Sequence, residues 1–316
     1  MVLACFALGC LNIFLALKGE DFSGQTGCSF HFDLPLKNLK FAASETPRHE
    51  DIQNAIEQLK ILGFITTDDK QNIHLTEDGR KISDLPLSFR SAAAYCEAEH
   101  LNILSQTLPL IALLEVDDIR KDRRHPLPKH YSTTSDLLNT MAHIYLAFSE
   151  AYATNTRNPA KICLSMNIAP HKLREYNAVL EALEKNLDMP ADFSIFRDIA
   201  NDFMIPEKEI KIMQVIFRAF SNDIYRTNLF GGPILRKTIE DHTFVNANIE
   251  RNSCLHTSHT TNAALSGMLR YVSPRRTGDR PMLFLENITA FTPEQIEAFA
   301  PRFPAAMEIL LEETAR

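Results

Sequence analysis

The pattern of apolar and polar positions is most regular between residues 52 and 87. Apolar residues at Ile52, Ile56, Leu59 and Leu62 recur at helical spacing, and the charged residues Glu57 and Lys60 lie on the other face. Gly63 follows at the point where a helix commonly ends in a left-handed cap. The spacing therefore predicts an amphipathic helix that ends at this glycine.

A hairpin and a second helix are predicted to follow. Phe64 and Ile65 begin a first strand, the run TTDDKQN makes a turn, and residues 73–75 return as a second strand. Thr76 is suited to cap a short helix that contains Gly79. Helix, cap, hairpin and helix together predict a winged-helix unit, a fold element that carries no chemistry by itself.

Further helices are predicted in the middle of the chain. Two apolar helical runs between residues 91 and 117 are typical of buried bundle helices. Ser135 and Asp136 provide capping chemistry for the helix LLNTMAHIYLAF, and a strongly one-sided helix runs from Glu207 through the sequence SNDIY. Residues 117–129 are charged and contain two prolines, so an exposed loop is expected. Its basic residues either contact phosphate or are neutralised by its own acids.

The last third of the chain breaks into short alternating runs. Such runs between residues 235 and 288 predict strands of a small barrel, and residues 293–313 are expected to be helical. We therefore expect an α+β fold that is mainly α: a winged helix followed by a helical bundle and a small β-barrel, which the family resemblance described below implies to be OB-like. The expected domains are residues 1–90, 91–204 and 205–316.

Composition narrows the function classes. The 316 residues are 45% hydrophobic and 23% charged, which is ordinary for globular proteins. The formal net charge of −7 argues against general polyanion binding, so nucleic acid would need a local basic face. The six cysteines are scattered without a C-x-x-C pair, which favours reduced thiols in a cytoplasmic protein.

The first 17 residues are apolar except for Asn12. An export signal or membrane anchor is one interpretation. However, no basic segment precedes the run, no cleavage site is obvious, and the run is shorter than the roughly 20 residues that span a bilayer. We therefore expect a core helix and no membrane partner, and membrane tethering stays open as the alternative.

Three sequence patterns invite a chemical interpretation. Residues 19–26 read GEDFSGQT, a phosphate loop in which Gln25 replaces the essential lysine, and a strand-like run follows where a helix is needed. Cys254, His256 and His259 have partial zinc-ligand spacing, with no second cysteine pair. Ser258 lies beside two histidines without a nucleophile elbow. We expect no catalytic residue, metal ion or cofactor in this chain.

The identities of the residues in the winged-helix stretch are more specific than its spacing of apolar and polar positions. "AIEQLKILGFI…LTEDGRKISDLPLS" closely resembles the helicase-associated region of DEAH-box RNA helicases. The matching positions are Ala55, Leu59, Leu62, Gly63, Leu75, Thr76, Gly79, Leu85, Pro86 and Leu87. Residues 135–183 resemble the family's ratchet bundle, with Tyr176 in place of a common tryptophan. The resemblance is weakest beyond Leu235, where CLHTSH stands for the family's "IHPSS" with Thr257 replacing proline.

The resemblance implies a function and a set of contact residues. The implied work is to form part of the single-stranded RNA channel and to brace motor domains that this chain lacks. ATP and Mg²⁺ would then belong to those motor domains, supplied in cis or in trans, and the chain alone should not hydrolyse ATP. The residues expected to contact RNA weakly are Lys161, Asn167, His171, Lys172, Arg174, Arg251, His256, Ser258, Arg276 and Arg280.

Two alternatives stay open. The basic residues of the bundle are also explained as surface charges or as ion pairs within a helix. A stand-alone winged-helix scaffold that binds proteins and no RNA accounts for the same pattern, and under the helicase interpretation a helicase-activating protein is a further expected partner of the winged helix.

Overall fold

The computed structural model describes residues 56, 58–60, 62–67, 73–83, 85, 87–122, 127, 134–154, 159–203, 206–221, 223–226, 235–236, 248–249, 264–272, 282–299 and 302. The chain divides into two compact units, Met1–Cys96 and Glu97–Arg316. The division falls within helix α5, Phe89–His100, which also contains the expected domain boundary at residue 90.

The first unit contains the predicted hairpin and the predicted glycine cap. Strands β1, Ile65–Thr67, and β2, Ile73–Leu75, pair antiparallel. Thr66 and Thr67, which the sequence pattern places in the turn, belong to β1 because they pair with residues of β2. Gly63 has a φ of 67°, and its N–H donates to the carbonyl of Lys60 at 2.8 Å. The N–H of Phe64 donates to the carbonyl of Leu59 at 2.9 Å, which completes a Schellman motif at the end of the helical residues.

Helix α4, Glu77–Ile82, follows the hairpin and begins at the predicted cap. The Oγ1 of Thr76 accepts from the N–H of Gly79 at 3.0 Å. The backbone N–H of Thr76 donates to the carbonyl of Phe64 at 3.1 Å, so the cap also joins the hairpin to the glycine turn. A Cβ on Gly79 would lie 2.1 Å from the carbonyl oxygen of Phe64, and this close approach explains the glycine.

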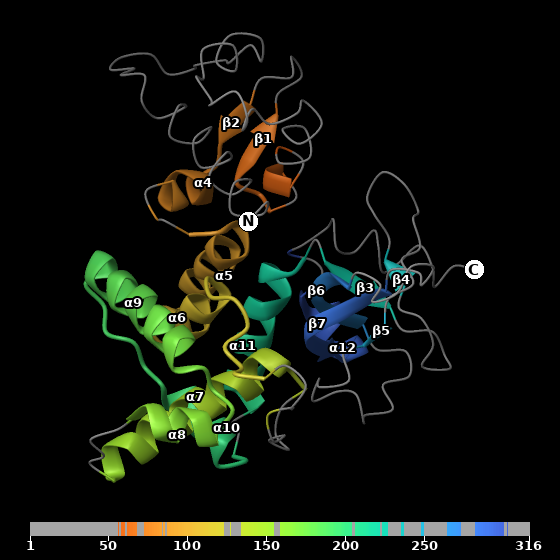
Figure 1. The fold of residues 1–316 in the computed structure, drawn as a ribbon. Coiled ribbons are helices and arrows are strands. Elements are labelled where there is room, and N and C mark those ends of the chain that lie inside the picture. Colours follow the sequence, from red (N-terminus) through yellow and green to blue (C-terminus); the bar gives the residue numbers. More distant parts are fainter. Residues whose placement is uncertain are drawn as a thin grey trace, which may run out of the picture. The chain divides into compact units, whose positions relative to one another are not determined.

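The second unit begins with helices, as the apolar pattern predicts (Figure 1). After α5 come α6, Leu104–Leu114, α7, Asp136–Ala153, α8, Pro159–Ser165, α9, Pro170–Leu187, α10, Ser194–Ala200, and α11, Pro206–Ala219. Helix α7 packs on α10 and α8, and α6 packs on α9 and α7. Leu108, Leu110 and Ile111 of α6 are fully buried, so this helix lies at the centre of the bundle core.

A five-stranded sheet follows the bundle. Its strands are β3, Ile224–Arg226, β4, Leu235–Arg236, β5, Asn248–Ile249, β6, Ala264–Val272, and β7, Met282–Phe291. The spatial order is β4-β3-β6-β7-β5, and every pair is antiparallel except β5 with β7. Helix α12, Pro293–Phe299, ends the described regular structure and starts where the sequence predicts a helix.

The sheet corrects two expectations. Residues 224–225 form strand β3, although the pattern places them in the preceding helix. The strand pairs with β4 at residues 235–236 and with β6 at residues 264–266. Among the described residues the sheet is open, because β4 and β5 occupy opposite edges, so the expected closed barrel is not seen. The mainly α composition with small sheets is confirmed.

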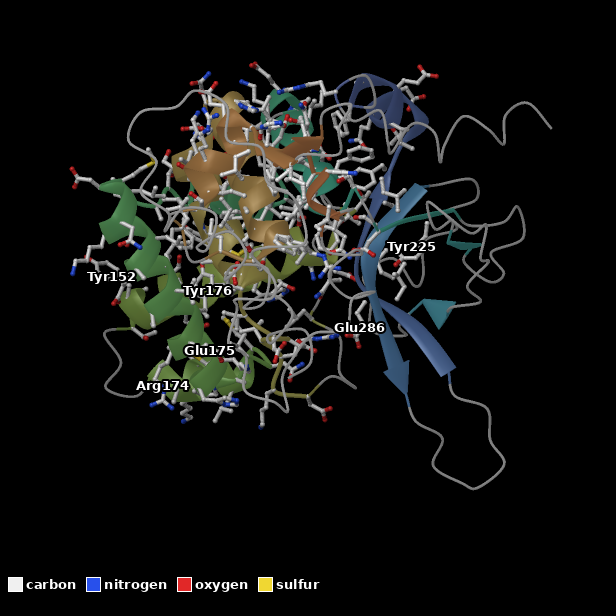
Figure 2. All side chains as sticks on the ribbon, turned by 90° about the horizontal axis from the view of Figure 1, so that it is seen from above. Tyr152, Arg174, Glu175, Tyr176, Tyr225 and Glu286 are labelled. Atoms are coloured by element: carbon white, nitrogen blue, oxygen red, sulfur yellow. The ribbon has the colours of Figure 1, made fainter. Side chains whose placement is uncertain are left out.

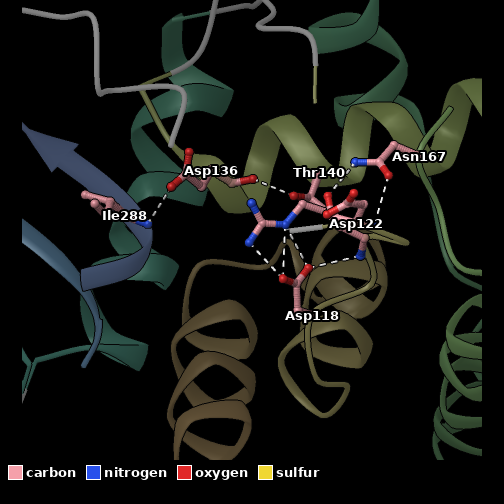
Figure 3. A network of polar contacts seen from close by, with 7 residues as sticks. Asp118, Asp122, Asp136, Thr140, Asn167 and Ile288 are labelled. Atoms are coloured by element: carbon pink, nitrogen blue, oxygen red, sulfur yellow. Dashed lines mark hydrogen bonds and ion pairs between the residues drawn. The ribbon is translucent and has the colours of Figure 1, made fainter. Parts of the chain in front are cut away.

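Bundle and sheet belong to one compact unit, which is not divided at the expected boundary after residue 204. The start of α7 is hydrogen-bonded to residues 288–290 of β7, beyond the part of the strand that pairs with β5. The carboxylate of Asp136 accepts from the N–H of Ile288 at 2.9 Å (Figure 3). The hydroxyls of Ser135 and Thr289 lie 2.7 Å apart, and both residues are fully buried.

A bulge in β7 makes this junction possible. Between the pairs Ser266 with Thr289 and Met268 with Glu286, β7 contains one extra residue. Asn287 has a φ of 53°, the left-handed conformation that a bulge of this kind uses. We infer that the bulge turns the N–H of Ile288 away from β6 and towards Asp136.

No helix among the described residues is both long and apolar enough to cross a membrane. The apolar residues 1–17 lie outside the described part of the chain.

Candidate nucleic-acid interface

Helices α8 and α9 present three of the predicted contact residues to solvent. Lys161 on α8 and His171 and Arg174 on α9 are exposed. Between the exposed positions of α9, Leu173 and Tyr176 are buried, because the helical period carries every third or fourth side chain into the core. Figure 2 shows Arg174 and Glu175 at the outer side of α9.

Lys172 lies on the same helix but already has partners. Its ammonium is 2.8 Å from a carboxylate oxygen of Glu175 and 3.9 Å from one of Asp117. Ion pairs of this kind contribute little to stability, yet they neutralise the charge that a phosphate would meet. The structure therefore agrees with the alternative of an ion pair within the helix for Lys172.

Asn167 organises a loop of its own chain. Its side-chain oxygen accepts from the N–H of Asp122 at 3.0 Å, and its side-chain nitrogen donates to the carbonyl of Asp122 at 3.1 Å (Figure 3). The residue has a φ of 58°, a conformation that asparagine tolerates better than most residues. Loop packing accounts for Asn167, so we leave it out of the contacts proposed below.

The segment opposite Asn167 corrects the expectation of an exposed loop. Ile119 is buried, and the N–H of Ala169 donates to its carbonyl at 2.9 Å. The guanidinium of Arg120 pairs with both carboxylate oxygens of Asp118, and both side chains are about nine-tenths buried. Arg120 is therefore paired with a carboxylate of its own chain, whereas Lys121 is exposed. The first half of the loop is a packed connection.

The start of α9 favours an anion electrostatically. Ala169 supplies no side-chain cap, and the first turn of α9 contains no acidic residue. The positive end of the helix dipole therefore lies beside His171, and the carboxylate of Asp117, 3.9 Å from the ammonium of Lys172 in the same turn, partly offsets it. Lys161 and Arg174 are thus two exposed cations that a phosphate could meet on α8 and at the start of α9, on a chain of net charge −7.

Two buried titratable groups on α8 and α9 have raised pKa values. Burial raises the pKa of the Tyr176 hydroxyl well above its usual range, and the nearby charge of Glu184 raises it further. Burial also raises the pKa of the Cys163 thiol, which keeps it protonated and a poor nucleophile. Cys96 and Cys163, the two cysteines among the described residues, are both buried and form no disulfide.

Several predicted residues lie outside the described part of the chain: Arg251, His256, Ser258, Arg276 and Arg280. The same holds for the phosphate-loop pattern at residues 19–26 and the zinc pattern around Cys254. Within the described residues, no group of three or more His, Cys, Asp or Glu side chains is placed to hold a metal ion.

Sequence reasoning missed two polar contacts between distant segments. The capping pattern places Asp136 at a helix start and does not indicate that its carboxylate also accepts a hydrogen bond from β7. Glu97 belongs to no sequence pattern, yet it is buried and paired with Arg302, more than 200 residues later. No local pattern signals either contact, because both partners lie far away along the chain.

A comparison with models of known protein families finds none that matches the chain.

Proposed function

We propose that this chain is the C-terminal accessory region of a DEAH-box RNA helicase. It contributes to the channel for single-stranded RNA and braces motor domains that act with it in cis or in trans. ATP and Mg²⁺ belong to those motor domains, the expected location is the cytoplasm, and a helicase-activating protein is a further partner of the winged helix. The support is the order of elements, the sequence resemblance and the sheet.

The strand order of the sheet carries the proposal. In an OB fold the first strand pairs with the second and the fourth, and the fifth strand lies between the fourth and the third, parallel to the third. Strand β3 pairs with β4 and β6, and β7 lies between β6 and β5, parallel to β5. Every observed pair matches that order; the pairing that would close the barrel, β4 with β5, is not among those described.

The remaining predicted contact residues belong to the connections between strands of this sheet. OB folds bind oligonucleotides with the face of the second and third strands and with two loops, one of which joins the last two strands. Arg276 and Arg280 belong to residues 273–281, which connect β6 to β7. Arg251, His256 and Ser258 belong to the connection between β5 and β6.

The first unit supports the same family. Its hairpin is closed by Thr76, and its helix ends in the Gly63 cap, both at positions that match the resemblance. The close approach of Gly79 to Phe64 explains a third matching position physically. These contacts favour a winged helix and carry no information on RNA.

RNA affinity measured against salt tests the proposal. Each phosphate contact to a single strand contributes about −0.7 to the log–log slope of affinity against salt. We expect weak binding of a single-stranded RNA probe, with a dissociation constant no better than about micromolar at physiological salt. Replacing Arg276 and Arg280 together by alanine should flatten the slope by about 1.4, and so should Lys161→Ala with Arg174→Ala.

A charge-matched variant provides the control. Lys185 is exposed on α9, and Lys211 makes only an exposed ion pair with Glu207 on α11. Replacing both by alanine removes the same two charges and should leave the slope unchanged. Absence of binding at low salt, or binding that does not respond to salt, would reject the RNA channel and favour a scaffold that binds proteins only.

A further inference from the structure

A buried carboxylate joins three segments of the second unit. Glu97 on α5 is 2% exposed. Its Oε1 accepts from the side-chain amide of Gln214 on α11 at 2.6 Å, and lies 3.0 Å from the guanidinium of Arg302. A buried carboxylate requires a cation or several donors to remain ionised. Gln214 is neutral, so Arg302 is the main cation that compensates Glu97.

His100 completes the cluster from the same helix. Its Nδ1 lies 4.0 Å from the second carboxylate oxygen of Glu97 and 3.4 Å from the guanidinium of Arg302. The Arg302 side chain is 46% exposed, so one end of the ion pair is in contact with water. The pair is therefore open to screening by salt from the Arg302 side.

Helix α12 is attached next to this cluster by one aromatic contact. Phe299, its last residue, is 1% exposed, and its ring lies 5.6 Å from that of Phe217 on α11. Phe217 in turn makes an edge contact with Phe291 of β7 at 5.3 Å. The remaining described side chains of α12 are exposed or half-buried. Phe299 is therefore the one fully buried side chain among the described residues of α12, and Arg302 follows three residues after the end of the helix.

The helix is also locally self-contained. Thr292 and Gln295 form a capping box: the N–H of Thr292 donates to the Gln295 side chain at 3.0 Å, and the N–H of Gln295 donates to the Thr292 hydroxyl at 3.3 Å. A short capped helix with few anchors is the kind of segment that opens before the rest of a domain unfolds.

We propose that α12 and Arg302 form a strap that opens and closes over α11 as one unit, with the Glu97–Arg302 ion pair as its clasp. Closing the strap buries Phe299 against Phe217 and neutralises Glu97. Opening it uncovers the aromatic surface of Phe217 and leaves Glu97 without its main cation. The strap thus links exposure of an apolar surface to the state of one ion pair, independently of RNA binding.

Hydrogen exchange of the full-length chain tests the strap. The amide of Ile296, which donates to the carbonyl of Thr292 at 3.0 Å, reports opening of α12, and the amides of β6 and β7 report opening of the sheet. In Arg302→Gln, exchange in α12 should rise about tenfold while exchange in the sheet stays unchanged. Arg302→Lys, which keeps the charge, should restore most of the protection.

Salt provides a second readout. Exchange in α12 of the parent chain should accelerate with salt, and this dependence should vanish in Arg302→Gln because the clasp is already lost. The control is Arg197→Gln, which removes a half-exposed arginine from another buried carboxylate, that of Asp198, and should leave α12 unaffected. Unchanged exchange in α12 of Arg302→Gln, or an equal rise in β6 and β7, would overturn the strap.

Discussion

Replacing Gly79 by alanine tests the packing of the winged-helix unit most directly. The added Cβ would lie 2.1 Å from the carbonyl oxygen of Phe64 and 3.0 Å from its carbonyl carbon. Ordinary Cβ atoms do not approach another atom within 3.0 Å, so helix and turn must separate by about 1 Å. The neighbour is backbone and cannot rotate away as a flexible side chain would.

The carbonyl of Phe64 is also held in place. It accepts from the backbone N–H of Thr76 and from its hydroxyl, both at 3.1 Å. Overpacking costs about 1–3 kcal/mol, and loss of one or two hydrogen bonds adds about 1–2 kcal/mol. Alanine returns about 1 kcal/mol through its better helix propensity. The expected net loss in the free energy of unfolding of the first unit is about 1–4 kcal/mol.

Denaturant-dependent hydrogen exchange of the β1 and β2 amides measures this loss. The chain contains no tryptophan, so fluorescence offers no selective probe of this unit. Arg80→Ala is the control, because Arg80 is the exposed neighbour on the same helix and its replacement should change stability by less than about 0.5 kcal/mol. Stability of Gly79→Ala equal to or above that of the parent chain would refute the close approach.

Three further predictions concern single residues. Gly63→Val should destabilise the first unit by roughly 1–2 kcal/mol, because a β-branched residue is disfavoured at its φ of 67°; unchanged thermal unfolding would contradict this. Asp136→Ala removes both the acceptor of the Ile288 N–H and the negative charge at the start of α7, so the second unit should lose about 1–3 kcal/mol in urea unfolding, and no loss would contradict the junction. Burial raises the pKa of Tyr176, so in the folded chain its phenol stays protonated where the unfolded chain ionises; stability should therefore fall as pH rises above about 10, and Tyr176→Phe should lessen that fall in alkaline unfolding experiments.

Most of the helical elements and their caps follow from local sequence. The helical period places α5, α6, α7 and α11 close to where they are found. Thr76 and Ser135 cap helices as predicted, and Gly63 takes the left-handed conformation. These features depend on backbone geometry and hydrogen bonds over a few residues, which the sequence alone specifies.

For the candidate contact residues, the sequence predicts exposure to solvent but not the hydrogen-bond partners. Exposure of Lys161, His171 and Arg174 follows from the amphipathic pattern of their helices. The pattern could not show that Asn167 bonds to Asp122, 45 residues earlier. An asparagine can bind a ligand or hydrogen-bond to a loop of its own chain, and only its neighbours in space distinguish the two roles.

The sheet and the long-range polar contacts were decided by tertiary structure. Ile224 and Tyr225 form a strand because β6 and β4 offer edges for pairing, although the local pattern continues a helix. Asp136 accepts a hydrogen bond from the bulge of β7, and Glu97 forms an ion pair with Arg302. A buried charge or an unpaired strand edge can be satisfied by any suitable group in the chain. The packing of the elements decides which group pairs with the charge or the edge, and the local sequence does not specify that packing.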